Sequence, residues 1–251
     1  MRRNPYAQSV SFGPGPLTPA VQALVVANVV MFVITAVAPR LSIYLGLTPT
    51  AVFGEFWAWQ VATYAFLHLD LMHLVFNMLA LWMFGVELER LWGTQRFAIY
   101  YAVCGVGAGV TTLVVSLLPF AATSPIYYTN VMGASGAVYG LLFAWAKYFP
   151  SRQVLMFFVF PVPARTFVVI MGAMALWFAA TSTGSGIAHA THLGGILAGW
   201  LYLQGKGGGG GLTAEIKYRY LKWKMARMRR NFDVVPGGRS GAGPSRWDGK
   251  H

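Results

Sequence analysis

The chain has 251 residues, of which 56% are hydrophobic and only 10% are charged, and its formal net charge is +12. Soluble domains carry about 25% charged residues. The apolar residues here form long continuous blocks, which are typical of membrane-spanning helices. The composition therefore excludes an ordinary soluble domain and predicts an all-α polytopic membrane protein.

Six apolar blocks approach the length of about 20 residues that a helix needs to cross a bilayer. They cover residues 20–38, 71–88, 97–118, 133–147, 166–180 and 187–204. The region between the first two blocks, residues 40–69, is rich in Trp and Tyr, which predicts a loop lying in the membrane interface. Pro161 and Pro163 interrupt the apolar segment 150–165, which predicts a hairpin or an interfacial piece rather than a crossing.

Both ends of the chain have a composition that differs from the apolar blocks. Residues 1–19 are polar and proline-rich, which predicts a flexible segment. Residues 205–251 hold a glycine run that predicts a hinge, followed by a basic stretch, 213–232, with the pattern of a helix lying on a membrane surface. Eleven of the 19 Lys and Arg residues follow Gly205. We expect this tail to meet anionic lipids rather than nucleic acid.

Basic residues near the span ends predict the orientation. With six spans, one side of the membrane holds the basic tail together with Arg2, Arg3, Arg90, Arg96, Lys147, Arg152 and Arg165. Only Arg40 falls on the other side. Because the cytoplasmic side carries the excess of Lys and Arg, both termini are predicted to be cytoplasmic.

Polar side chains inside membrane spans are costly and are therefore functional candidates. His73 and Asn77 lie on the second predicted span, Ser135 on the fourth, and His189 and His192 on the sixth. At about 1.5 Å per residue from the charged end of each span, Asn77, Ser135 and His192 lie about 20, 18 and 21 Å deep. A common depth on three helices predicts one shared site.

Glycines beside Ser135 and His192 predict close helix packing. Gly136 follows the serine, and Gly195 and Gly199 follow the histidine in a G-x-x-x-G pattern, which lets membrane helices approach closely. Packing alone could explain the serine, because serine is itself small. If the imidazole reaches the hydroxyl, however, the pair has the geometry of general-base activation. The common depth favours this second interpretation.

The neighbouring groups complete a site for nucleophilic chemistry. Ser135 lies in the first turn of its predicted helix, where free backbone N–H groups favour a developing anion. His73 and Asn77 share one helix face at i and i+4 and could supply side-chain donors to the same oxyanion. The set amounts to a nucleophile, a base and an anion hole.

These residues resemble the motifs of the rhomboid family of intramembrane serine proteases. The family's G-x-S-G appears at Gly133–Gly136, its H-x-x-x-x-H-x-x-x-N at His68–Asn77, and its H-x-x-G-x-x-x-G at His192–Gly199. An E-x-x-x-G after the second span matches Glu89 and Gly93. The resemblance covers about residues 20–204. It implies a six-helix rhomboid-like bundle with an interfacial first loop and a short fourth helix that carries the active site.

The resemblance also implies an activity. It implies a dyad of Ser135 and His192, an oxyanion hole formed by His73, Asn77 and the Ser135 backbone N–H, and a Tyr139 ring packed on the histidine. Substrates would be single-pass membrane proteins cut in or near the bilayer, with no cofactor. The six-span form resembles bacterial members, which implies a bacterial inner membrane. One departure is that the family's first-loop Trp-Arg is Trp59-Gln60 here.

Two other hypotheses remain open on the sequence. A metal site could use His68, His73, His189 and His192. No H-E-x-x-H motif is present, however, and Asp70 is the only carboxylate nearby. The third hypothesis, a binder of membrane proteins without catalysis, is disfavoured because both Ser135 and His192 are present. For His68 and His189 singly, structural hydrogen bonding is favoured over catalysis. The sequence gives no indication of the oligomeric state.

Overall fold

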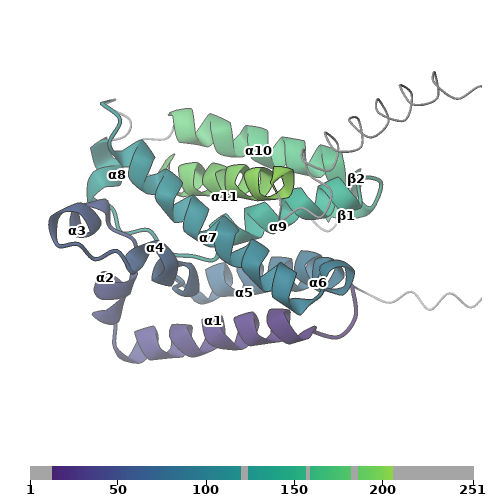
Figure 1. Ribbon diagram of the computed structural model, residues 1–251, viewed down its shortest axis with the longest axis horizontal. Coiled ribbons are helices and arrows are strands. Elements are labelled where there is room, and N and C mark those ends of the chain that lie inside the picture. Colours follow the sequence, from purple (N-terminus) through teal and green to yellow (C-terminus); the bar gives the residue numbers. More distant parts are fainter. Residues whose placement is uncertain (1–12, 120–123, 157–158, 182–185, 206–251) are drawn as a thin grey trace, which may run out of the picture.

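The computed structural model describes residues 13–119, 124–156, 159–181 and 186–205, most of which are helical (Figure 1). The long helices are α1 (Pro19–Val37), α7 (Thr94–Ser116), α9 (Ser135–Tyr148), α10 (Ala164–Thr181) and α11 (Gly186–Gln204). A further helical segment comprises α5 (Leu71–Ala80), a π-helical turn (Leu81–Gly85) and α6 (Val86–Trp92). Each of the six predicted blocks coincides with one helical segment.

Four of these segments are long and apolar enough to cross a membrane, namely Pro19–Val37, Leu71–Trp92, Thr94–Ser116 and Ala164–Thr181. Helix α9 has 14 residues, fewer than the about 20 that a crossing needs. On α10, Val169 and Trp177 are 69% and 67% exposed. Large apolar side chains on the outside of long helices belong in hydrocarbon rather than in water. The chain is a multi-pass membrane protein.

The region predicted as an interfacial loop is folded into short helices. These are α2 (Leu41–Leu45), α3 (Pro49–Gly54) and α4 (Gln60–Thr63), followed by a 3-10 turn at Tyr64–Phe66. They gather at one end of the bundle, beside α8 (Ser124–Tyr128) (Figure 1). The Trp57 ring lies 5.2 Å from Tyr44 and 5.8 Å from Trp59, measured between centroids. Tyr and Trp rings favour a membrane–water interface, so the interfacial location stays a prediction with this cluster in its favour.

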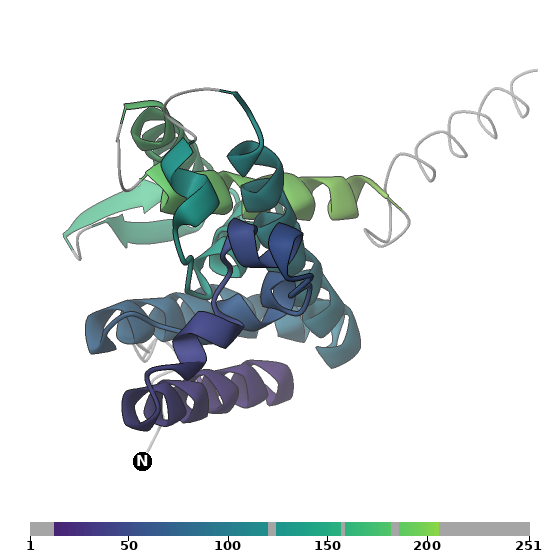
Figure 2. The same ribbon diagram turned by 90° about the vertical axis from the view of Figure 1, so that its left-hand side faces the viewer.

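The segment that follows α9 forms a two-stranded antiparallel hairpin, as one of the two sequence-based alternatives predicted. Strand β1 (Gln153–Met156) pairs with β2 (Phe160–Pro163) in the register Val154↔Val162 and Leu155↔Pro161. The two strands project sideways from the helices in Figure 2. Proline cannot continue a helix, and β2 pairs with β1 instead. The described residues are therefore mostly helical, which agrees with the predicted helical membrane fold, and this hairpin is the exception.

The end of the segment predicted to be flexible, residues 13–18, is held against the second span. Trp82 Nε1 donates to the Gly15 carbonyl at 2.8 Å, and the Arg90 guanidinium donates to the Pro14 and Pro16 carbonyls. Gly15 has a φ of 91°, a conformation that favours glycine. Residues 13–18 are thus held in place, although their composition predicts flexibility. Residues 1–12 and the basic tail, 206–251, lie outside the described residues.

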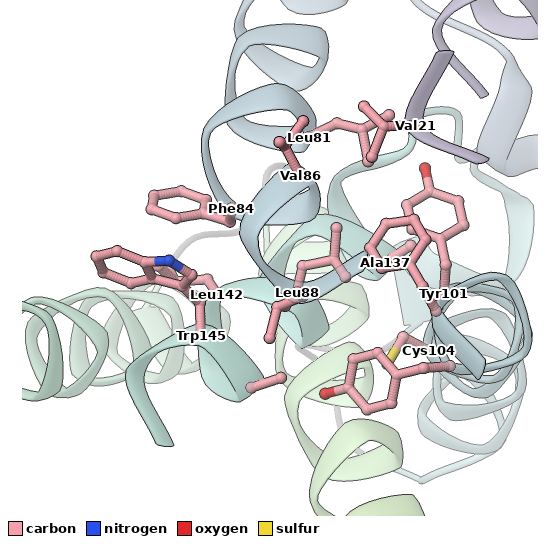
Figure 3. Close-up of a cluster of buried hydrophobic side chains, with 14 of the residues drawn as sticks. Val21, Leu81, Phe84, Val86, Leu88, Tyr101, Cys104, Ala137, Leu142 and Trp145 are labelled. Atoms are coloured by element: carbon pink, nitrogen blue, oxygen red, sulfur yellow. The ribbon is translucent and has the colours of Figure 1, made fainter. Parts of the chain in front are cut away.

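Buried side chains from four segments meet in one core. Figure 3 shows Val21 of α1 near Leu81 of the second span, with Tyr101 and Cys104 of α7 and Trp145 of α9 in the same cluster. Cys104 is fully buried and, as the one cysteine of the sequence, forms no internal disulfide. This core fixes α7 and α9 against the second span, which sets the position of the residues at the start of α9.

The Glu89 carboxylate joins three helix ends. It is 3% exposed and accepts hydrogen bonds from the Thr18 hydroxyl at 2.5 Å, the Ala20 and Val21 backbone N–H groups at 2.9 and 3.0 Å, and the Thr94 hydroxyl at 2.7 Å. The first N–H groups of a helix have no partner within the helix. Glu89 therefore caps α1 and ties α6 to the start of α7.

We expect Glu89→Gln to lower the free energy of unfolding by about 1–3 kcal/mol. An amide has only one oxygen, so its NH₂ group would face donors that the carboxylate now satisfies. The measurement is the thermal unfolding midpoint in detergent. Glu55→Gln, at an exposed carboxylate of the first loop, is the matched control and should leave the midpoint unchanged. Equal midpoints for both variants would contradict the capping role.

Candidate active site

Ser135 and His192 lie in hydrogen-bond contact. Ser135 is the first residue of α9, and His192 lies within α11. The His192 Nε2 atom is 2.8 Å from the Ser135 Oγ atom. A neutral imidazole nitrogen at this distance can accept the hydroxyl proton, which is the arrangement that activates a serine. The structure thus brings together the two residues that the depth comparison paired.

The imidazole is held by rings rather than by an acid. The Tyr139 ring stacks on it, with centroids 4.2 Å apart and planes 6° apart. His189 meets it edge-on at 5.8 Å and itself stacks on Phe178. Among the described residues, the buried Nδ1 atom of His192 has no hydrogen-bond partner. The described part of the chain therefore has no third, acidic member, and the flat face of Tyr139 orients the base.

The close approach of α9 and α11 depends on Gly195, because a Cβ atom there would overlap the Gly136 carbonyl oxygen. Gly136 instead allows α9 to approach α7, since a Cβ atom on it would lie 2.6 Å from the Ala108 Cβ. The G-x-x-x-G pattern predicts that Gly199 faces the helix of Ser135 as well. Its neighbours are instead Tyr100 and Cys104 of α7. Gly195 therefore sets the spacing between the two helices of the site, whereas Gly199 sets the spacing between α11 and α7.

The predicted oxyanion residues lie on α5, beside the turn that precedes the serine. Gly133 has a φ of 133°. A Cβ atom at Gly133 would lie 2.9 Å from His73 Nε2 and 3.6 Å from Ser135 Oγ, so the imidazole edge and the hydroxyl border the same small space. The Asn77 amide donates to the His73 carbonyl at 2.8 Å. His73 is thus beside the nucleophile, while Asn77 supports the turn of α5 that carries it.

His68 lies behind His73 in ring contact, with centroids 5.1 Å apart. Burial, together with the neighbouring His73, lowers the pKa of His68 to about 4, so this imidazole is neutral near pH 7. The ring contact with His73 packs His68 against α5, and structural hydrogen bonding by its imidazole stays a prediction. Asp70 accepts from the His73 backbone N–H at 2.8 Å and caps α5.

The metal hypothesis finds no ligand set in the described residues. No group of three His, Cys, Asp or Glu side chains comes close enough there to hold a metal ion. His68 and His73 contact each other, and His189 contacts His192, through ring edges. Ring contacts of this kind do not direct several nitrogens at one point.

Two residues of the first loop support the serine turn and were not singled out in the sequence. The Tyr64 carbonyl accepts from the Gly133 N–H at 3.0 Å, and its hydroxyl donates to the Gly105 carbonyl of α7 at 2.7 Å. Leu47 and Val131 exchange two backbone hydrogen bonds at 2.9 and 2.8 Å. The first loop is therefore docked on the segment that leads into Ser135.

Gln60 explains how the loop keeps its shape without the family's arginine. It is fully buried. Its amide nitrogen donates to the Ile43 and Tyr44 carbonyls at 3.1 and 3.2 Å, and its oxygen accepts from the Thr48 N–H at 3.0 Å. One neutral amide thus binds three backbone groups of the loop, of which the Tyr44 carbonyl also accepts from Trp59 Nε1 at 2.9 Å. The replacement of arginine at this position was the only indication of its role in the sequence.

We expect Gln60→Ala to lower the free energy of unfolding by about 2–4 kcal/mol, since it removes the hydrogen bonds to the Ile43 carbonyl and the Thr48 N–H and leaves a cavity. Thermal unfolding in detergent measures this. Gln22→Ala, at an exposed position of α1, removes the same side chain without those contacts and should change little. A loss as small as that of the control would show that the amide does not hold the loop.

Comparison with known proteins decides the family. A family model described as the Rhomboid domain matches residues 55–206, more than half of the chain. The chain belongs to the rhomboid family. The matched range contains every residue of the candidate site and leaves α1 outside it.

Named relatives of this rhomboid come from yeast and from bacteria. Rhomboid protein 1, mitochondrial, of Saccharomyces cerevisiae is 37% identical over 142 residues, which are 55% of this chain and 39% of the relative. Rhomboid protease GluP of Bacillus subtilis is 31% identical over 59% of this chain and 25% of the relative. Rhomboid protease GlpG of Yersinia pestis is 27% identical over 80% of this chain and 66% of the relative. This rhomboid spans less than half of the length of the first two.

Proposed function

We propose that this rhomboid is a serine endopeptidase that cleaves single-pass membrane proteins within or near the bilayer. The observation that carries the proposal is the 2.8 Å contact between His192 Nε2 and Ser135 Oγ. Two of the relatives bear the name rhomboid protease. The membrane-spanning helices around the site support a substrate that reaches it from the bilayer.

In the proposed mechanism, Ser135 Oγ attacks the scissile carbonyl carbon while His192 Nε2 takes the hydroxyl proton. The tetrahedral oxyanion would receive hydrogen bonds from the Ser135 backbone N–H, His73 and Asn77. His192 then returns its proton to the leaving amine, and the C–N bond breaks to leave an acyl-serine. A water molecule gives a proton to His192 and attacks the acyl carbon. The imidazolium then returns that proton to Ser135 Oγ as the acyl C–O bond breaks, which frees the carboxylic acid product and restores Ser135.

In the proposal, nucleophilic attack and proton transfer need only the side chains of Ser135 and His192. A neutral imidazole has one N–H and one accepting nitrogen, so Nδ1 carries the proton when Nε2 accepts from Ser135. An acid usually fixes this tautomer in serine proteases. Here the stacked Tyr139 ring fixes the plane of the imidazole, and the packing of α11 limits its rotation.

The proposed topology has six spans, residues 20–204, with both termini in the cytoplasm and the bacterial inner membrane as location. Helices α9 and α11 would complete the six. Residues 1–19 would form an N-terminal segment and 205–251 a basic tail that meets anionic lipids, and nucleic acid is not expected to bind. The experiment is a reporter enzyme fused to the C-terminus, which should be active only in the cytoplasm; activity on the far side would refute the six-span arrangement.

Labelling with a fluorophosphonate tests the chemistry. The detergent-solubilised protein should gain the label on Ser135, identified by mass spectrometry of its peptides, and should release fragments from a model single-span substrate. Both results should vanish in Ser135→Ala. Cleavage that persists in this variant, or that a chelator abolishes while wild type stays unlabelled, would overturn the serine mechanism. Binding of the substrate without cleavage would favour a non-catalytic binder.

A further inference from the structure

The β1–β2 hairpin carries apolar side chains that the other described residues leave exposed. Val154 is buried, but Leu155, Val159 and Phe160 are 52%, 65% and 58% exposed. Leu155 pairs with Pro161 across the two strands, on the face opposite to Val154. An isolated two-stranded hairpin is marginally stable in water, and one that exposes apolar side chains would be less so. The hairpin therefore requires an apolar environment that the described residues do not provide.

Positive charge surrounds the stem of the hairpin. Arg152 precedes β1 and its side chain is 62% exposed, while Lys147 of α9 and Arg165 of α10 are also exposed. The nearby carboxylate, Glu87, accepts from Trp145 Nε1 at 2.7 Å and lies 3.7 Å from Arg152. Within the described part of the chain, Lys147 and Arg165 form no ion pair. A basic stem, with the apolar Val159 and Phe160 further along the hairpin, matches the boundary between anionic headgroups and acyl chains.

The hairpin is placed to reach that boundary. It connects α9 to α10, and it projects sideways past the helices rather than along them (Figure 2). The outward side of α10 exposes Val169 and Trp177, which lie in hydrocarbon in a membrane protein. The chain thus passes directly from the apolar hairpin into α10, whose outward side faces lipid. The basic Arg165 lies at this junction.

We propose that the β1–β2 hairpin binds the bilayer that the protein spans. Leu155, Val159 and Phe160 would lie among the acyl chains, and the basic stem (Lys147, Arg152 and Arg165) would lie on anionic headgroups. The stem is tied to α10, because the Ala164 N–H donates to the Arg152 carbonyl at 2.8 Å and the Arg165 N–H to the Pro150 carbonyl at 3.4 Å. The lipid contact would therefore fix the first turn of α10. This inference does not depend on the proposed protease activity.

Lipid-attached quenchers test the apolar contact. A Phe160→Cys variant is labelled with an environment-sensitive fluorophore and reconstituted into phosphatidylcholine vesicles; Cys104 is fully buried and stays unlabelled. Lipids brominated on their acyl chains should quench the probe about as strongly as they quench one at Val169→Cys, and aqueous iodide should quench it weakly. Strong iodide quenching without bromine quenching would overturn the proposal. Quenching that instead grows with protein density would assign the surface to a second copy of the chain.

Charge variants test the headgroup contact. Adding phosphatidylglycerol should increase bromine quenching at Phe160→Cys, and Lys147→Gln with Arg165→Gln should remove this increase while leaving quenching in neutral vesicles unchanged. Each charge should shift the bound population about fivefold at low salt. If phosphatidylglycerol does not change bromine quenching in the Phe160→Cys protein that keeps Lys147 and Arg165, the headgroup part of the proposal is wrong. Fluorescence needs no turnover, so failure of the protease assay does not affect this result.

Discussion

Replacing His192 with phenylalanine is expected to reduce both fluorophosphonate labelling and substrate cleavage by about 10⁴-fold or more. The phenyl ring can keep the stacking contact with Tyr139, whose ring lies 4.2 Å from the imidazole. It has no nitrogen to take the Ser135 proton. The only change at the site is then the loss of the base, and a hydroxyl without a base is a weak nucleophile near neutral pH.

The controls separate chemistry from folding. The thermal midpoint of His192→Phe should stay close to that of wild type, because the contact with Ser135 Oγ is the hydrogen bond that the imidazole loses and Nδ1 makes none within the described residues. Tyr139→Phe keeps the stacked ring and should retain activity within a few-fold. A His192→Phe protein that is still labelled at Ser135 would show that another group acts as the base.

The main helices and the pairing of the site could be predicted because both depend on regular spacing. A bilayer crossing fixes the length of an apolar block, and a constant rise per residue converts sequence position into depth. Ser135 and His192 were matched on depth, and the structure places them 2.8 Å apart. The sequence could not give the rotation of each helix, and so it did not show that Gly199 faces α7 rather than α9.

Contacts between loops could not be predicted, because they join backbone groups that the sequence does not distinguish. The Gln60 side chain binds carbonyls 16 and 17 residues away, and its effect depends on the path of the chain between them. The same holds for residues 13–18, whose composition predicted flexibility. Trp82 and Arg90 hold that segment from positions about 70 residues further along the chain.

The largest expected effect outside the dyad is that of Gly195→Ala, which should lower the rate of cleavage by about 10²-fold or more. Its new Cβ would overlap the Gly136 carbonyl oxygen. This is a backbone atom next to Ser135, so α9 and α11 must separate to make room. A displacement of about 1 Å at a reacting pair can cost about 10²-fold in rate, and the 2.8 Å contact between Ser135 and His192 spans these two helices.

Gly172→Ala is the matched control, since a Cβ atom there would meet nothing closer than Ile196 Cδ1 at 3.9 Å. Alanine also has the higher helix propensity, so this variant should be as stable as wild type or more stable by about 0.5–1 kcal/mol. The rate of fluorophosphonate labelling, measured well below the unfolding midpoint of each variant, distinguishes a displaced dyad from a poorly folded protein. If Gly195→Ala reacts as fast as Gly172→Ala, the site does not require the close approach of α9 and α11. A serine moved away from its base should instead react slowly in a protein that is still folded.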